Sequence, residues 1–225
     1  MKKIFMSLLC LGLLFGCSET SEPEEKQAKN ERQDLEIVKS GYSLSSEDMP
    51  YIMYGIELKN PNTSYSVEFP NVKITAYDKD GNVLATSDQT FNTIAPGETI
   101  YWGSQADCAE QVPDKVTFEV TNLEEDYLET EDPSSSKDLE ITQKNVNSDE
   151  FSTNFTGKVK NNGSEDISSV NISVILYKDD QIVFGTGGYV DNLAAGKELP
   201  FEVSEYSDIP EYDTYEVYAL NWSFD

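Results

Sequence analysis

The strongest constraint on the fold of this chain is a strand-like pattern that occurs twice. In each place apolar residues occupy every second position and lead up to a tyrosine, which is typical of a β-strand with one buried face. The two series are Val72, Ile74, Ala76 and Tyr77, and Ile172, Val174, Leu176 and Tyr177. Each series therefore predicts a half-buried strand, and their similarity indicates an internal repeat.

The repeat extends over residues 35–122 and 139–223 with a period near 100 residues. Turn sequences recur at matched places, as in 55–61 and 157–163, 78–81 and 178–181, and 94–98 and 193–197. They separate strands about every 8–12 residues, a spacing typical of small sandwiches. We expect an all-β chain with two small Ig-like antiparallel β-sandwich modules, each of six or seven strands in Greek-key order.

The rest of the chain divides around these modules. Residues 1–16 read as a lipoprotein signal peptide, and 17–34 as an acylated cysteine followed by a disordered tether. The first module is predicted over 35–122 and the second over 139–225. Between them, residues 123–138 are acidic and contain Pro and three consecutive serines, so they predict an extended linker.

The N-terminal residues carry the most specific signal. Lys2 and Lys3 precede the apolar stretch 4–16, which is shorter than a bilayer-spanning helix needs to be. It ends in Leu14-Phe15-Gly16-Cys17, which resembles the bacterial lipobox. The resemblance implies that Cys17 is acylated and becomes the first residue of the mature protein. An ordinary cleaved signal peptide and an uncleaved anchor are the alternatives.

Charge and composition exclude several classes of function. The chain has 16 Lys+Arg against 42 Asp+Glu, a net charge of −26 and no His. So acidic a protein does not bind nucleic acid through phosphate contacts, and it cannot use Ser-His-Asp or Cys-His chemistry. Cys108 is the one cysteine beyond the lipobox, so we interpret it as a half-buried or loop thiol. We expect no catalytic residue, no metal site and no cofactor.

Both repeated regions resemble the FxLYD domain, a module of Gram-positive and archaeal surface proteins. The positions of its Phe-x-Leu-Tyr-Asp motif read Ile-Thr-Ala-Tyr-Asp over 74–78 and Val-Ile-Leu-Tyr-Lys over 174–178. The tyrosine is kept in both copies and the aspartate in the first. The resemblance covers about 170 of the 225 residues. It implies display outside the cytoplasm beside a lipid or transmembrane anchor, and it implies no activity and no functional residues.

Three local features have two interpretations each. The segment 78–82 is partly similar to a calcium loop, but Asp-Gly between alternating strands favours a hairpin turn. The acidic clusters 124–126 and 129–132 could hold divalent cations loosely, although dense charge more often serves solubility. Trp102 has the ring of a sugar-stacking platform, but its position matches Phe201 of the second copy and favours the core.

The last strand of the second copy has two apolar faces. One is expected to face the core, and the other forms a candidate interaction patch. The patch consists of Tyr218, Leu220, Trp222 and Phe224. Exposed apolar patches of this kind mark contact sites. The alternatives are a C-terminal extension packed on the module's own sheet, a bulge that turns the residues inward, or packing against the other module.

These features predict a lipid-anchored protein on the extracytoplasmic face of the cell membrane, with a Gram-positive host favoured. Its modules are expected to be non-catalytic interaction modules. The expected partners are the membrane, through the lipid on Cys17, and an envelope protein or wall polymer, with no nucleic acid. One alternative is an accessory or regulatory lipoprotein of a membrane sensor, transporter or secretion complex. A weaker one is a carboxylate-based enzyme acting on glycans.

Overall fold

The structure is a computed structural model that describes residues 32–46, 50–121, 127–128 and 136–222. Contacts divide the chain into residues 1–31 and a compact unit, residues 32–225. The predicted signal peptide, Cys17 and most of the predicted tether therefore lie outside the described residues, as do both acidic clusters of the linker.

The described residues contain β-strands and one short 3-10 helix, so the all-β class is confirmed. The elements of the first module and its C-terminal extension are β1 (Glu36–Leu44), β2 (Tyr51–Lys59), β3 (Ser66–Val67), β4 (Asn71–Tyr77), β5 (Val83–Thr90), β6 (Thr99–Asp107), β7 (Lys115–Thr121) and β8 (Tyr127–Leu128). Those of the second are η1 (Ser136–Asp138), β9 (Leu139–Ser148), β10 (Thr153–Asn161), β11 (Ile167–Lys178), β12 (Gln181–Leu193), β13 (Glu198–Glu205) and β14 (Thr214–Asn221).

The two modules have the same strand order. The first pairs its strands as β1-β2-β6 and β5-β4-β7, and the second as β9-β10-β13 and β12-β11-β14. All of these pairs are antiparallel. In both modules the chain enters one sheet for two strands, crosses to the other for two, returns for one and crosses again for the last. The repeat read from the sequence is thus a repeat of topology.

Each module has its own hydrophobic core between its two sheets. The alternating residues of β4 are buried in the first core, and those of β11 in the second. Yet β2 and β11 are also buried on their other face, from 52 to 56 and from 170 to 176. A sandwich strand with both faces buried needs a further layer outside its own module.

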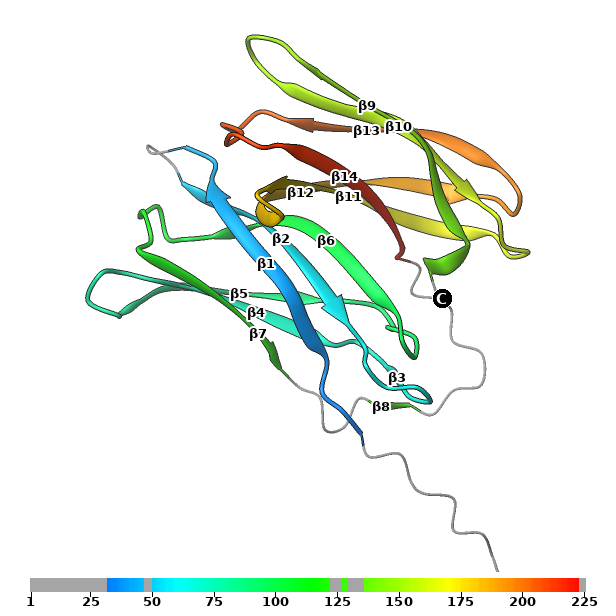
Figure 1. Ribbon diagram of the computed structural model, residues 1–225, viewed down its shortest axis with the longest axis horizontal. Coiled ribbons are helices and arrows are strands. Elements are labelled where there is room, and N and C mark those ends of the chain that lie inside the picture. The colour runs from blue at the N-terminus through cyan, green and yellow to red at the C-terminus, as the bar shows by residue number, and fades with distance from the viewer. Residues whose placement is uncertain (1–31, 47–49, 122–126, 129–135, 223–225) are drawn as a thin grey trace, which may run out of the picture. The chain divides into compact units, whose positions relative to one another are not determined.

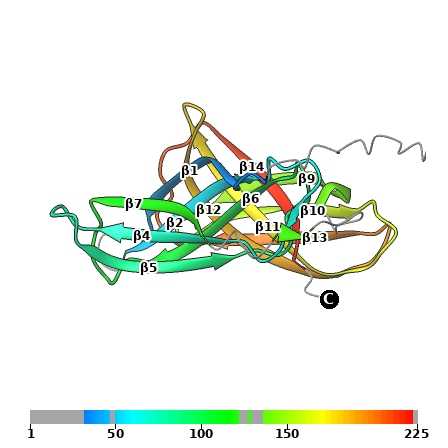
Figure 2. The same ribbon diagram turned by 90° about the horizontal axis from the view of Figure 1, so that it is seen from below.

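That layer is the other module. Strand β12 contacts β1, β2 and β6, and β6 also contacts β11 and β14. The sheets β1-β2-β6 and β12-β11-β14 therefore lie face to face, between the outer sheets of the two modules (Figures 1 and 2). The expected arrangement of two modules joined only by a linker is incomplete, because a sheet-on-sheet junction also joins them.

Both predicted connecting segments are partly docked on the modules. At the end of the tether, the Gln33 amide donates to Asn62 Oδ1 at 2.8 Å and the Gln33 carbonyl accepts from Asn62 Nδ2 at 2.7 Å. In the predicted linker, β8 pairs with β3. At its end, the Ser136 amide donates to Glu98 Oε1, and Ser136 Oγ accepts from the Asn221 amide. Hydrogen bonds to residues far along the chain thus hold parts of both segments on the modules, against the charge repulsion that the composition suggested.

One buried asparagine fixes the same corner in each module. Asn60 Nδ2 donates to the carbonyl oxygens of Tyr65, Ile94 and Ala95 at 2.8 to 3.1 Å, and its Oδ1 accepts from the Asn62 amide. Asn161 follows the matching strand β10, and its Nδ2 donates to two carbonyls while its Oδ1 accepts the Gly163 amide. Both side chains are buried, at 0% and 1% exposed. Each asparagine thereby connects the turn after one strand, β2 or β10, to the residues that precede the neighbouring strand, β6 or β13.

We predict that Asn60→Ala and Asn161→Ala each lower the free energy of unfolding by about 3 kcal/mol, because buried carbonyls lose their donor. The free energy is measured by urea denaturation followed by circular dichroism. The control is Asn145→Ala, since Asn145 is an exposed residue of β9 and should change stability by less than about 0.5 kcal/mol. Equal effects at buried and exposed positions would contradict this role.

Candidate functional site

The junction between the modules is built on glycine. Gly41, Gly55 and Gly103 lie in one cross-strand row of the sheet β1-β2-β6. Gly185 and Gly187 of β12 face this row: a Cβ on Gly185 would lie 2.2 Å from the Tyr54 carbonyl oxygen. A Cβ on Gly187 would lie 2.7 Å from the Gly103 carbonyl oxygen. Glycine in a strand allows such close approach of another backbone.

A buried polar chain crosses the junction. The Gly103 amide donates to Ser173 Oγ at 3.0 Å, and that hydroxyl donates to Asn171 Oδ1 at 2.7 Å. Ser173 and Asn171 are 0% and 2% exposed. The Gly103 amide lies on β6, an edge strand of its sheet, and finds its hydrogen-bond partner in the other module. Without that partner, burying this amide would be costly.

Each core also contains a buried residue of the other module. Met53 of β2 is 4% exposed and packs in the core of the second module. Leu220 of β14 is 5% exposed and packs in the core of the first. Because each core contains an apolar side chain of the other module, separating the modules would expose both.

This geometry determines the position of the predicted patch. Tyr218 stacks on Tyr101 with ring centroids 3.8 Å apart, and Trp222 lies against Trp102 at 4.7 Å. With Leu220 buried in the first core, three of the four patch residues contact the first module, and Phe224 lies outside the described residues. These contacts agree with packing between the modules, which was one of the alternatives. Leu220 in particular is buried and is not exposed to a partner.

A cluster of tyrosines surrounds the Tyr101–Tyr218 stack. The hydroxyl groups of Tyr177 and Tyr218 are 3.2 Å apart, and the Tyr101 hydroxyl donates to Glu57 Oε1 at 3.5 Å. Burial raises the pKa of Tyr218 and of Tyr177, and for Tyr101 burial and the Glu57 charge both raise the pKa. The three tyrosine hydroxyls therefore stay protonated and uncharged at neutral pH, so these side chains place no charge between the modules.

The other predicted residues have structural roles. Trp102 is 2% exposed and meets Phe91 edge to face, so its assignment to the core is confirmed. Segment 78–82 forms the predicted hairpin turn between β4 and β5, where Asp78 accepts the amides of Asp80 and Asn82. The Asn82 side-chain amide also donates to Asp78, and this hydrogen bond, followed by the backbone ones, lowers the pKa of Asp78. Among the described residues, no three acidic, histidine or cysteine side chains are grouped as a calcium site would require.

Cys108 is more buried than the sequence suggested. It follows β6 in a loop, is 0% exposed, and its Sγ donates to the Pro50 carbonyl at 2.8 Å. Burial raises the pKa of this thiol, which keeps it protonated and a poor nucleophile. The contact joins the start of β2 to the end of β6, so we assign Cys108 to the core of the first module.

A polar cleft of about 400 Å³ opens beside the glycine junction. Its wall combines glycines of both modules with the side chains of Gln105, Asn171, Glu205 and others. Two exposed tyrosines also line it: Tyr189 of β12, at 55%, and Tyr206 after β13, at 77%. The cleft exists only because the modules meet, since Gln105 belongs to the first module and Glu205 to the second.

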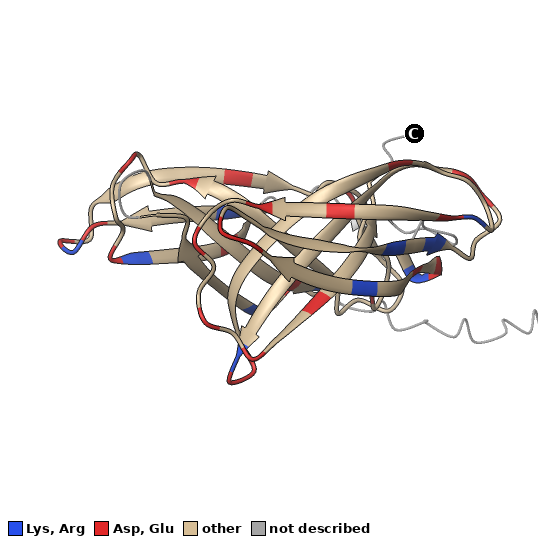
Figure 3. Ribbon diagram, turned by 90° about the horizontal axis from the view of Figure 1, so that it is seen from above, with Lys and Arg blue, Asp and Glu red and all other residues tan. Residues whose placement is uncertain are grey.

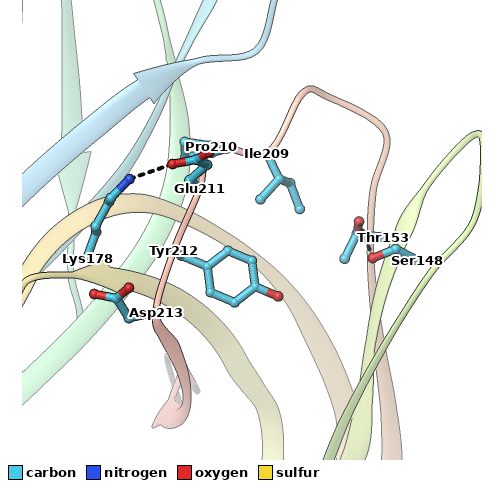
Figure 4. Close-up of a pocket in the computed structure, with 8 residues that line it drawn as sticks. All are labelled: Ser148, Thr153, Lys178, Ile209, Pro210, Glu211, Tyr212 and Asp213. Carbon is cyan, nitrogen blue, oxygen red and sulfur yellow. Dashed lines mark hydrogen bonds and ion pairs between the residues drawn. The ribbon is translucent and has the colours of Figure 1, made fainter.

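A second hollow, of about 550 Å³, lies at one end of the second module, beside the turns (Figure 4). Ile209, Pro210 and Tyr212 line it together with a Lys178–Glu211 ion pair at 2.8 Å. Phe151, in the nearby turn between β9 and β10, is 78% exposed. The lining of this hollow mixes apolar and charged side chains, and the hollow is open to solvent.

The sequence suggested packing between the modules only as one alternative for the last strand, although the chain contains a wider signal for the junction. The outward positions of the inner strands should be charged if water covered them, yet they are mostly Gly, Ser, Ile or Met. The residues are Gly41, Met53, Gly55, Gly103, Ser173, Ile175, Gly185 and Gly187. Polar-out alternation therefore fails where a second sheet covers the strand.

Comparison with known proteins identifies no related group: no family model matches the chain, and no curated protein matches it. The resemblance to the FxLYD domain thus stays a prediction. Within the described ranges, no helix has the length and apolarity to cross a bilayer.

We predict that Gly103→Val or Gly185→Val separates the unfolding of the two modules into two thermal transitions, where the wild type shows one. Either side chain would clash with backbone atoms of the other module and force the sheets apart. The measurement is differential scanning calorimetry.

The matched control is Gly81→Asn, at a turn glycine with φ of 82° and open space around it, where Asn tolerates the backbone and one transition should persist. Two transitions in the wild type would show that the junction does not couple the modules.

We also predict an alkaline loss of stability that depends on Tyr54. Burial raises the pKa of Tyr54 from 10.0 to about 12. Its contribution is therefore fully present below pH 10 and is lost as pH rises from 10 to 12, because the unfolded chain ionises first. The loss amounts to about 2–3 kcal/mol.

Tyr54→Phe should flatten the slope of unfolding free energy against pH over this range, as measured by urea denaturation. The exposed Tyr51 supplies the control, since Tyr51→Phe should leave the slope as in the wild type. An unchanged slope in Tyr54→Phe would contradict the assignment.

Proposed function

We propose that this chain is a lipid-anchored lipoprotein on the extracytoplasmic face of the cell membrane, and that its two β modules act as one non-catalytic binding unit. The observation that supports binding is the composite cleft, which residues of both modules line. The anchor is proposed from the lipobox-like residues 14–17, with Cys17 as the lipidated residue. Two acyl chains hold a protein stably at a bilayer, where one does so marginally.

The charge distribution supports the lipid as the anchor. Asp and Glu recur on the loops and strands of both modules, with fewer Lys and Arg among them (Figure 3). A net charge of −26 is repelled by anionic lipid headgroups, so the protein surface does not supply the attraction.

A second candidate function is an accessory subunit of a neighbouring membrane protein. The hollow beside Tyr212 and the exposed Phe151 favour it, because protein contacts commonly combine an exposed aromatic side chain with polar surroundings. In this case the partner would bind the end of the second module and leave the junction cleft open.

The anchor is tested by Cys17→Ser in the producing bacterium. We expect the wild type in the membrane fraction and the variant in the medium, as measured by immunoblotting of fractions and by metabolic labelling with an alkyne fatty acid. Cys10→Ser is the control, because Cys10 lies in the predicted signal peptide and its loss should change neither result. Retention of an unlabelled Cys17→Ser protein in the membrane would show a different anchor.

The binding role is tested on intact cells by cross-linking, with the wild type compared with the shed Cys17→Ser form. A defined partner captured by the wild type supports the proposal. If the capture is lost in Phe151→Ala and kept in Tyr189→Ala, the accessory role is favoured.

A further inference from the structure

We propose that the cleft at the module junction binds a short stretch of a neutral oligosaccharide. The inference rests on the proposed binding unit and names its ligand class. The cleft volume of about 400 Å³ lies in the range of small-ligand sites rather than of protein contacts. A ligand chain could continue beyond both ends, since the cleft is open to solvent.

The two tyrosines supply the flat surfaces that a sugar ring needs. Tyr189 lies within β12 and Tyr206 directly follows β13, and both line the cleft while more than half of each residue is exposed. An aromatic ring has a negative face, which attracts the C–H bonds on one side of a pyranose ring. Rings exposed without a protein partner on their faces are available for such stacking.

The polar lining matches hydroxyl groups. Gln105 and Ser104 approach from β6, and Ser204 from β13. Amides and hydroxyls both donate and accept, as sugar hydroxyls do. Among the described residues that line the cleft there is no Lys or Arg, so no cationic side chain there would neutralise a phosphate or a carboxylate. With a protein charge of −26, this favours a neutral glycan over an anionic polymer.

Glu205 adds a fixed acceptor. It is 8% exposed, and its Oε1 accepts the Ser207 amide at 2.9 Å, which orients the carboxylate. Among the described residues Oε2 has no hydrogen-bond partner. A carboxylate oxygen that accepts from a ligand hydroxyl forms a charge-assisted hydrogen bond, which is stronger than a neutral one. We assign to this oxygen the recognition of one sugar hydroxyl.

The test uses the purified full chain and three neutral hexasaccharides, namely cellohexaose, maltohexaose and hexa-N-acetylchitohexaose, with polygalacturonate as the anionic comparison. Binding is measured by isothermal titration and by tryptophan fluorescence, since Trp102 lines the cleft. We expect at least one hexasaccharide to bind with a Kd below about 1 mM, and polygalacturonate not to bind.

The variants locate the binding. Tyr189→Ala and Tyr206→Ala should each weaken it by about tenfold, whereas Tyr189→Phe should stay within about twofold because the ring remains. Glu205→Gln should weaken it through loss of the charge. The control is Tyr51→Ala, at a tyrosine outside the cleft that is 47% exposed, with no expected change. Circular dichroism and the melting temperature verify that each variant folds.

Either of two titration results would overturn the inference: no binding of any neutral hexasaccharide at about 10 mM, or binding that survives in Tyr189→Ala/Tyr206→Ala. A protein partner whose cross-linking is lost in Tyr206→Ala would also overturn it, while the proposed binding role would stand. Conversely, sugar binding together with membrane retention of Cys17→Ser would support the cleft and contradict the proposed anchor. The two proposals can therefore fail separately.

Discussion

The close approach of two backbones at the module junction is the constraint on which the rest of the structure depends. A row of glycines in the sheet β1-β2-β6 faces glycines of β12, and a Cβ at Gly103 would lie 2.5 Å from the Thr186 carbonyl oxygen. At this distance Met53 reaches the second core and Leu220 the first. The tyrosine stack and the cleft lie at the edges of the same contact.

The junction also has to hold together a strongly acidic protein. Like charges repel, and both modules contain an excess of Asp and Glu (Figure 3). The centre of the contact avoids this repulsion because the facing residues are uncharged. At its edge Lys39 Nζ pairs with Asp180 Oδ2 at 3.1 Å, across the modules. As an exposed pair it contributes little stability, so apolar burial and backbone fit hold the modules together.

The fold of each module could largely be predicted from the sequence. The alternation of apolar residues in β4 and β11 predicted these strands, and the turns with glycine or asparagine predicted where strands end. Both signals depend on only a few neighbouring residues. The tether and linker could be predicted less well. Gln33 and Ser136 bond to groups far along the chain, and such long-range pairing leaves no periodic signal in either segment.

The sequence by itself determined the all-β class, the duplicated topology and the assignment of Trp102 to a core, since each follows from periodicity and from the match of one copy to the other. Only the tertiary structure decided what the outward faces do. Tyr218 and Leu220 read as a patch because a strand pattern shows that a face is apolar and does not show what packs on it. The cleft was likewise beyond the sequence, since Gln105 and Glu205 meet only through the junction.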